Sequence, residues 1–338
     1  MTDFFELTPE QQSQRLEAAG REALGQWDIV DAQLRLIKYR ENAVFEVNTS
    51  TGRYALRLHR FGYHSNDELR SELQWMQALS EAGIRVPTII TTRSGQAFVL
   101  QGGAGLPGDI QIDLFEWVEG EQLGSVEEGV SDVSTVASSY RTMGELAARV
   151  HNQASTWQLP EGFVRHAWDA EGLTGEQPFW GRFWELEAAS REQRELLIAG
   201  RERVFAALSS LDQSPDVYSM IHADFAPENL MIDSHGVRLI DFDDAGFGWH
   251  LFELATSLYF ILDEPYVDTA RQALIEGYRA HRSLSDEQLE QLPLFLTARG
   301  FTYLGWVHTR HETETARELT PALLEMACRQ TETYLASE

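Results

Sequence analysis

The sequence predicts an α+β fold with two lobes, the first rich in strands and the second mainly helical. Residues 33–118 contain several short segments of alternating apolar side chains, interrupted by one amphipathic helical segment. From about residue 134 the apolar spacing becomes chiefly helical. At 338 residues and 43% hydrophobic content, the chain is long enough to bury a core in each lobe. We place the lobes at residues 1–118 and 119–338.

The first lobe is expected to begin with a helix and to continue with strands. Thr8 precedes a proline and an acidic first turn, which is typical of a helix start, and this helix should run to about Leu24. A second helix is predicted after Ser65, because Glu68 completes a capping box, and it should reach about Ala82. Strands are predicted at residues 33–39, 43–48 and 53–59, around Ile89 and Phe98, and at residues 111–118.

A polar loop followed by a short hairpin carries the residues best suited to chemistry. Apolar segments at residues 230–232 and 237–240 flank a turn, and Asp241 follows the second of them directly. In such a hairpin Asp224, Asn229 and Asp241 can converge at one end. Mg²⁺ prefers oxygen ligands from a few protein groups together with substrate phosphates. The pattern therefore predicts a site for phosphoryl transfer.

The spacing of His222, Asp224, Asn229 and Asp241 resembles the signature of the aminoglycoside phosphotransferase superfamily, which shares the protein-kinase fold. Taken singly, each could be an ordinary loop residue, since turns are rich in Asp and Asn. Four matches in register favour the site. The resemblance implies a bilobal kinase-like enzyme that uses ATP and Mg²⁺. It also implies that Asp224 is the base or orienter of the acceptor hydroxyl, and that Asn229 and Asp241 hold the metal.

A cation for the nucleotide phosphates is expected on the third strand of the first lobe. Ala55 and Arg57 share one strand face, as do the alanine and lysine of the kinase Val-Ala-Ile-Lys pattern. By this analogy Arg57 binds the α- and β-phosphates, and Glu72 on the second helix pairs with it. Glu68, one turn earlier, is an alternative partner. A solvent-facing strand arginine is the alternative interpretation of Arg57.

Two further segments of the first lobe resemble nucleotide-binding parts of the superfamily. Residues 39–43 stand where kinases have a glycine-rich loop, and Asn42 or its backbone N–H is the expected phosphate contact, although the glycines are absent. Residues 115–120 resemble the hinge. There, backbone groups near Glu116 and Val118 would bind the adenine edge.

Other residues around the loop are interpreted as supporting ones. His222 is expected to hold the loop backbone rather than to react. Asp243 and Asp244 extend the acidic run, and one of them is expected to stabilise the loop through a turn at residues 247–248 or to face substrate. Glu253 stands where the superfamily usually has an aspartate, and the resemblance implies that it ties down the catalytic loop.

The composition limits the partners. A formal net charge of −26 argues against binding to nucleic acid or to an anionic membrane, since both are held by Lys and Arg fields. The single cysteine, Cys328, excludes a disulfide framework. The first residues lack a signal-peptide pattern and no apolar run is long enough to span a bilayer, so we expect a cytoplasmic protein. The oligomeric state is left open.

The acceptor is predicted from charge and from the resemblance. Superfamily members phosphorylate homoserine, choline, aminoglycosides or other small alcohols, and one branch phosphorylates protein Ser and Thr. Because the site is acidic, a small amino alcohol or amino-acid alcohol, such as homoserine, is favoured. A Ser/Thr protein kinase and a catalytically silent nucleotide-binding module are the alternatives. Five aromatic residues could wall a pocket for a cationic amine, although we favour a core position for them: Phe179, Trp180, Trp184, Tyr303 and Trp306.

Overall fold

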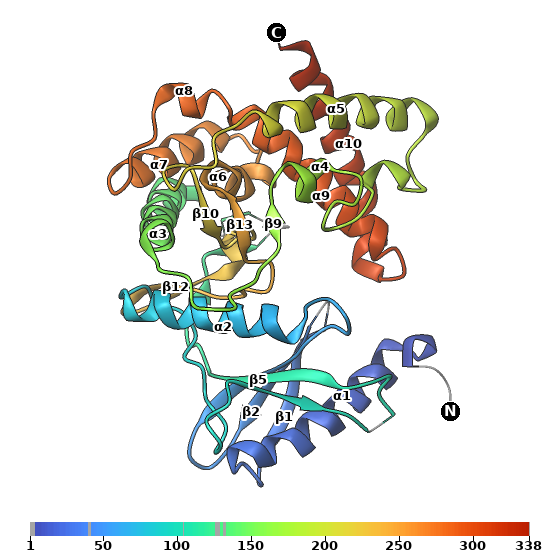
Figure 1. Cartoon of the computed structure of the whole chain (residues 1–338), viewed down its shortest axis with the longest axis vertical. Coiled ribbons are helices and arrows are strands. Elements are labelled where there is room, and N and C mark those ends of the chain that lie inside the picture. Colours follow the sequence, from blue (N-terminus) through green and yellow to red (C-terminus); the bar gives the residue numbers. More distant parts are fainter. Residues whose placement is uncertain (1–3, 40–41, 104, 126–128, 131–132, 338) are drawn as a thin grey trace. The chain divides into compact units, whose positions relative to one another are not determined.

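The computed structural model describes residues 4–39, 42–103, 105–125, 129–130 and 133–337. The chain forms two compact units, drawn in Figure 1. Unit 1 comprises Met1–Glu121, Leu159–Val164 and Met231–Ile240, and unit 2 comprises Gln122–Gln158, Arg165–Leu230 and Asp241–Glu338. The first unit is rich in strands and the second is mainly helical, so the predicted α+β class is confirmed.

Unit 1 is built on a five-stranded antiparallel sheet with the order β1-β2-β3-β5-β4. Each strand is short and alternates between two faces, as the apolar pattern predicted. The strands are β1 Gln33–Tyr39, β2 Ala43–Asn48, β3 Arg53–Leu58, β4 Phe98–Gln101 and β5 Ile110–Glu116.

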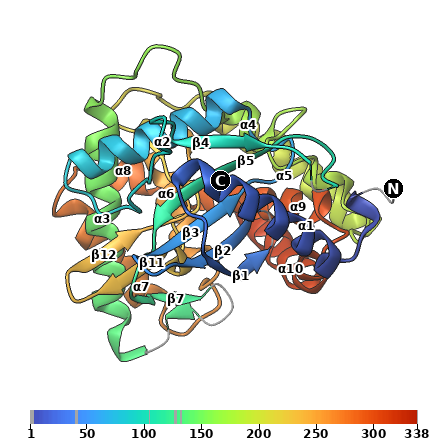
Figure 2. The ribbon, with the colours of Figure 1, turned by 90° about the horizontal axis from the view of Figure 1, so that it is seen from below.

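Helix α1 (Pro9–Ala23) covers one face of this sheet (Figure 2). Thr8 and Gln11 form a capping box at its start, and the short 3₁₀ segments Phe4–Glu6 and Leu24–Trp27 flank it. A Cβ added at Gly20 would lie 2.9 Å from Leu56 Cδ2, so the glycine lets the helix approach strand β3 closely. Leu56 and Leu58 join the same apolar core.

Helix α2 (Asn66–Glu81) contacts the side of β3 opposite to Leu56 and Leu58. Side chains alternate along a strand, so Arg57 points to that other side, where it reaches Glu72 of α2. Ser65 and Glu68 form the predicted capping box. Gly83 follows the helix with a φ of +76°, a conformation that glycine adopts at little cost.

The predicted hairpin is formed by β11 (Leu230–Asp233) and β12 (Gly236–Leu239), in a sheet with the order β12-β11-β6, where β6 is Glu121–Gln122. Arg85 fixes the hairpin within unit 1. Its guanidinium binds the Asp233 carboxylate at 2.5 Å, and its carbonyl accepts the Leu239 N–H at 3.0 Å. This contact explains why residues so late in the chain belong to the first unit.

Unit 2 is a helical assembly in which small residues allow close packing. A Cβ at Gly144 would lie 2.0 Å from the Leu274 carbonyl oxygen, and one at Gly277 would lie 2.1 Å from that of Arg141. These two glycines therefore let α3 and α7 lie backbone against backbone. The helices are α3 Val136–Thr156, α4 Ala170–Thr174, α5 Arg191–Ser209, α6 His250–Tyr259, α7 Val267–Arg279, α8 Asp286–Leu289, α9 Leu292–Thr309 and α10 Glu314–Ala336.

A small sheet with the order β10-β13-β9 lies within the same unit. Its strands are β9 Ala167–Trp168, β10 Tyr218–Ile221 and β13 Gly246–Trp249. The predicted turn at residues 247–248 is wrong, because these residues belong to β13. A Cβ at Gly248 would lie 2.5 Å from Ile221 Cδ1, so this glycine serves close packing rather than a turn.

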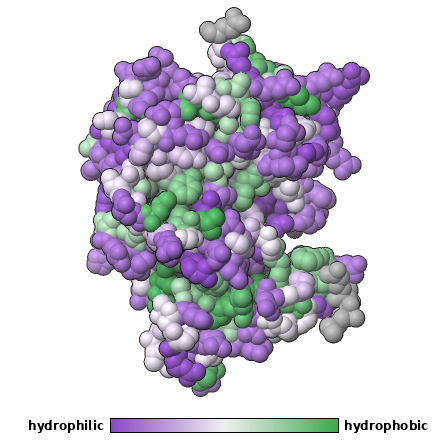
Figure 3. Space-filling model, viewed as in Figure 1, coloured by the Kyte–Doolittle hydropathy of each residue, from purple (hydrophilic) through white to green (hydrophobic). Residues whose placement is uncertain are grey.

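Other elements are minor. Residue Ile89 makes an isolated bridge to Phe115 instead of the predicted strand. The remaining short elements are β7 Gly124–Ser125, β8 Gly129–Val130, and the 3₁₀ segments Val133–Thr135, Phe183–Glu185 and Pro227–Asn229. Among the helices that the structure describes, none combines the length and apolar character that crossing a bilayer requires. The face in Figure 3 is mostly hydrophilic over the helical unit.

Candidate active site

Arg57 lies at the centre of a buried ion-pair cluster in unit 1. The residue is 7% exposed, and its Nη2 donates to Glu72 Oε1 at 2.8 Å, so the predicted pair forms. Its Nε and Nη2 also donate to the two oxygens of Asp113, at 3.1 and 2.7 Å. Arg57 is thus not a solvent-facing residue. Glu68 is not its partner, because that side chain caps α2.

Asp113 is a member of this cluster that the sequence analysis missed. It stands directly opposite Arg57 in the β3–β5 pair, and His59 Nε2 lies 3.1 Å from its Oδ2. Burial works against ionisation of Asp113, but Arg57 and His59 outweigh it and hold the pKa of this carboxyl below its ordinary value. The only signal in the sequence is an acid within the apolar strand β5.

The nucleotide-binding candidates of the first unit are only partly described. Arg40 and Glu41 of the predicted phosphate loop lie outside the described residues. Asn42 accepts the backbone N–H of Arg60 through its Oδ1 at 3.0 Å. Glu116 donates its backbone N–H to the Thr88 carbonyl at 2.9 Å, so that N–H is committed within the fold.

Asp224 and Asn229 of the predicted catalytic loop meet in unit 2. Asn229 Nδ2 donates to the Asp224 carbonyl at 2.8 Å and to Asp224 Oδ2 at 2.7 Å. Asn229 lies in a single 3₁₀ turn, Pro227–Asn229, which brings its amide back over the loop. The Asp224 side chain is still 25% exposed. A carboxylate that is held by hydrogen bonds and is still partly exposed suits the orientation of an acceptor hydroxyl.

Arg299 binds the second oxygen of Asp224 and was also missed. Its Nη2 donates to Asp224 Oδ1 at 3.0 Å, and the arginine itself, on helix α9, is 0% exposed. Its guanidinium carbon lies 4.1 Å from the Tyr303 ring centroid and 5.1 Å from that of Trp180. The sequence signal is a single cation within the otherwise uncharged helix segment Leu292–Thr309.

Glu253 holds the backbone of the catalytic loop. Its Oε1 accepts the His222 N–H at 3.1 Å, and its Oε2 accepts the Ala223 N–H at 2.6 Å. Ala223 has a φ of +64°, which is unfavourable for a non-glycine residue, so these bonds stabilise a strained turn. Burial raises the pKa of Glu253, while the hydrogen bonds that it accepts from the two backbone N–H groups oppose this. The His222 ring packs edge-on against Phe242, with centroids 4.8 Å apart.

The acidic segment after the hairpin is fixed through its backbone. Arg165 donates to the Asp243 and Ala245 carbonyls at 2.5 Å each. Trp168 Nε1 donates to the Asp244 carbonyl at 2.9 Å. Asp241 has a φ of +64°, and the Asp243 side chain is buried. Short contacts from strand β9 and the residues before it therefore set the shape of the segment that carries Asp241.

The donor atoms of this loop fit a hard divalent cation. Because Asn229 Nδ2 is committed to Asp224, the amide turns its oxygen away from that carboxylate. An amide oxygen and the Asp241 carboxylate are both ligands that Mg²⁺ accepts. The residues present thus fit a metal of this class.

The aromatic candidates contact the protein's own cations or rings. Arg299 lies over Trp180 and Tyr303, Arg201 over Trp184 at 4.3 Å, and Arg310 over Trp306 at 5.2 Å. Phe179 stacks on His166 with centroids 3.8 Å apart. Trp180 and Tyr303 are buried, as the core interpretation predicts, whereas Phe179, Trp184 and Trp306 are half-buried.

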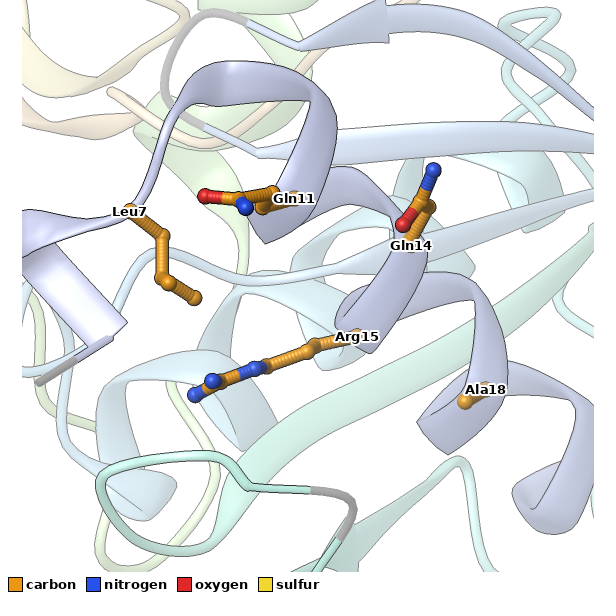
Figure 4. A pocket seen from close by; sticks show the side chains of 5 residues that line it. All are labelled: Leu7, Gln11, Gln14, Arg15 and Ala18. Carbon is orange, nitrogen blue, oxygen red and sulfur yellow. The ribbon is translucent and has the colours of Figure 1, made fainter. Parts of the chain in front are cut away.

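A surface hollow of about 290 Å³ lies along the start of α1 (Figure 4). Its lining residues are Leu7, Gln11, Gln14, Arg15 and Ala18. Arg15 Nη1 donates to the Gly105 carbonyl at 2.6 Å. No predicted site residue lines this hollow, so we assign it no part in the chemistry.

Comparison with known proteins identifies a family whose pattern includes the clusters around Arg57 and Asp224. The pattern of the phosphotransferase enzyme family matches residues 34–287, which is 254 of the 338 residues and includes Arg57, Asp224, Asn229 and Asp241. The chain belongs to the phosphotransferase enzyme family. The predicted family and the predicted enzyme class, a kinase, are confirmed.

Two relatives of this phosphotransferase have assigned activities. The amicoumacin kinase of Bacillus subtilis is 23% identical over 308 residues, covering 88% of this chain and 86% of that protein. The homoserine kinase of Rhizobium meliloti is 28% identical over 268 residues, covering 77% and 73%. Both of these relatives are named as kinases.

Two solved structures share its fold. A microcompartment-associated aminopropanol kinase superposes with a TM-score of 0.84 at 30% identity, covering 95% of this chain and 98% of that one. An amicoumacin kinase in complex with AMP-PNP, Ca²⁺ and Ami superposes with a TM-score of 0.75 at 19% identity, covering 96% and 97%. The second shows a nucleotide analogue and a divalent cation together on this fold.

Proposed function

We propose that this phosphotransferase moves the γ-phosphoryl group of Mg·ATP to the hydroxyl of a small amino alcohol or amino-acid alcohol. The observation that carries the proposal is the Asp224 carboxylate, which is fixed on both oxygens yet 25% exposed. Such a group can accept the proton of a hydroxyl, or orient it, without reorganising during the reaction.

In this proposal unit 1 supplies the nucleotide-binding residues. Arg57, braced by Glu72 and Asp113, would bind the α- and β-phosphates. Asn42 is a contact for phosphate. The Glu116 carbonyl and the Val118 N–H bind the adenine edge, because the Glu116 N–H is already committed to Thr88.

Unit 2 supplies the metal ligands and the acceptor-orienting carboxylate. Asn229 and Asp241 hold Mg²⁺, which neutralises charge on the phosphates. Glu253 and Arg165 keep the two loop backbones in place through the bonds described above. Asp224 receives the hydroxyl proton as the oxygen–phosphorus bond forms and the bond to ADP breaks.

The acceptor class rests on charge and on the likeness to an aminopropanol kinase. Asp224, Asp241, Asp243 and Asp244 lie on two connected loops in a chain with a net charge of −26. A like charge brought close in a partly desolvated site costs several times more than in water. Since the aromatic candidates contact the protein's own arginines or, for Phe179, His166, we assign recognition of the ammonium to acids rather than to aromatic faces.

The test is ADP release with Mg·ATP and acceptors matched in shape but different in charge. One set is 1-amino-2-propanol, 1,2-propanediol and lactate, and a second is homoserine with its uncharged and anionic analogues. We expect the cationic or zwitterionic member to have the highest kcat/KM in each set. A clear preference for the anionic member would refute the acceptor assignment.

The alternatives give different outcomes in the same assay. Turnover with a basic Ser/Thr peptide but with none of the alcohols would identify a protein kinase. Binding of Mg·ATP with no transfer to any acceptor would identify a silent nucleotide-binding module.

A further inference from the structure

Arg299 is a buried charge with few partners. The residue is 0% exposed, and its Nη2 donates to Asp224 Oδ1 at 3.0 Å and to the Tyr303 hydroxyl at 2.8 Å. Among the described residues, its Nε and Nη1 have no hydrogen-bond partner. A buried cation needs a counter-charge, and within the described part of the chain Asp224 is the carboxylate that forms an ion pair with it.

Aromatic rings complete the surroundings of Arg299 and restrict its movement. The guanidinium carbon lies 4.1, 5.1 and 5.5 Å from the ring centroids of Tyr303, Trp180 and Phe252. Trp180 in turn packs against Trp168, with centroids 5.1 Å apart. A planar cation among ring faces has few alternative positions. Its Nη2 is therefore a fixed donor.

Asp224 is consequently held by one donor on each oxygen. Arg299 donates a hydrogen bond to Oδ1, and Asn229 donates one to Oδ2 at 2.7 Å. These two donors come from separate elements of the unit, Asn229 from the 3₁₀ turn Pro227–Asn229 and Arg299 from α9. Together they define the plane of the carboxylate and the direction of the lone pairs that remain for an acceptor hydroxyl.

We propose that Arg299 is the positioning residue of the reaction: it acts through Asp224, sets the orientation of that carboxylate, and has no contact with the acceptor. The inference rests on the proposed role of Asp224. Because Arg299 is wholly buried, a substrate cannot reach it, and its effect should appear in kcat rather than in the affinity for Mg·ATP.

The test is a double-mutant cycle in the full-length protein. Arg299→Met removes the charge but fills the space, and Asp224→Asn removes the carboxylate that Arg299 positions. Single-turnover rates are measured with saturating Mg·ATP and the best acceptor of the matched sets, alongside the Kd for Mg·ATP. Arg201→Met is the matched control, since Arg201 also stacks on a tryptophan, Trp184, but pairs with Glu176.

We expect Arg299→Met to lower the rate by about 10–100-fold, the scale of a small misplacement of a catalytic group, with the Kd for Mg·ATP unchanged. In the Asp224→Asn background the same substitution should change the rate by less than about threefold, since non-additivity marks residues that act together. Arg299→Lys should be intermediate, because it keeps the charge without the planar fork. Arg201→Met should react at the wild-type rate.

Equal fold-losses from Arg299→Met in both backgrounds, or a single variant within threefold of wild type, would overturn the inference. If the methionine variant does not fold, Arg299→Lys and Tyr303→Phe carry the test, and wild-type rates in both would overturn it. Failure of the proposed function looks different. In that case the wild-type protein itself transfers no phosphoryl group to any acceptor tried.

Discussion

Arginines hold the acidic groups of both clusters in place. Arg57 binds Asp113 through two nitrogens, and Arg299 binds Asp224 through one. Arg165 does the same for the acidic segment by donating to two backbone carbonyls. Buried charges persist where they are paired and hydrogen-bonded, so Arg57 and Arg299 each require and orient an acidic partner. The result is a set of carboxylates with little freedom to reorient.

The metal assignment gives a prediction at a single residue. Asp241→Asn should abolish Mg²⁺-dependent binding of ATP, because one of two proposed ligands loses its charge while the phosphates keep theirs. Calorimetric titration with Mg·ATP measures this, and wild-type protein with EDTA gives the metal-free reference. Unchanged affinity in the variant would move the metal to another acid, such as Asp243.

For individual side chains, the sequence predicts contacts between residues close in the chain well and contacts between distant residues poorly. The contact of Asp224 with Asn229 and that of Arg57 with Glu72 join residues 5 and 15 positions apart. Those of Asp113 with Arg57 and Arg299 with Asp224 span 56 and 75 positions. Spacing within a motif or between neighbouring elements indicates the first kind. The second kind depends on how strands and helices pack, which no local period encodes.

Among the elements, helices α3 and α6 share a buried chain of polar side chains that ends at the catalytic loop. His151 of α3 lies 2.9 Å from the Tyr278 hydroxyl and 3.3 Å from Glu253 Oε1. It stacks on His250, whose Nε2 lies 2.8 Å from Ser219 Oγ. Burial holds the pKa of both histidines well below the ordinary value, so both are neutral in the folded protein near pH 7.

This burial predicts loss of stability in mild acid. The unfolded chain protonates its histidines near pH 6.5, whereas the folded chain does not, so the unfolded state gains protons as the pH falls below that value. The free energy of unfolding should therefore be constant above about pH 7 and decrease below about 6.5, by at most about 1.4 kcal/mol per pH unit for each histidine.

Urea unfolding at several pH values between about 7.5 and 5 measures this slope. His250→Gln, which retains a partner for Ser219, should reduce it. A stability that rises on acidification over this range, or an unchanged slope in the variant, would contradict the assignment of neutral buried histidines.

Elements with strong local signals were predicted closely. The caps at Thr8 and Ser65 gave the starts of α1 and α2, and alternating apolar residues gave β1, β2 and β3. The sequence predicts a turn at residues 247–248, whereas the structure has strand β13 there, with glycines at positions 246 and 248. Both positions need glycine because His166 and Ile221 lie too close for a side chain there. In a sequence, a glycine required by packing looks the same as a glycine required by a turn.

For the whole molecule, the dominant property is its negative charge. With 53 acidic and 27 basic residues, the surface should attract a cationic acceptor from a distance. The value of kcat/KM for such an acceptor should fall as salt rises from about 0.01 to 0.1 M, over which the Debye length shortens from about 30 to 10 Å. The kcat should barely change.

An uncharged acceptor of the same shape is the control, and its kcat/KM should not respond to salt. If the two acceptors respond alike, long-range attraction contributes nothing to acceptor choice. The acceptor preference would then depend on contacts within the site alone.

The rate of phosphoryl transfer by Asp224→Ala tests the proposed role of this carboxylate directly. Single-turnover assays with saturating Mg·ATP and the preferred acceptor should show a decrease of about 10²–10⁴-fold, the usual span for a positioned proton-transfer group. The Kd for Mg·ATP should stay close to that of the wild type, because Asp224 is not one of the proposed nucleotide or metal ligands. A variant that reacts within threefold of the wild-type rate would remove Asp224 from the mechanism and contradict the proposed site.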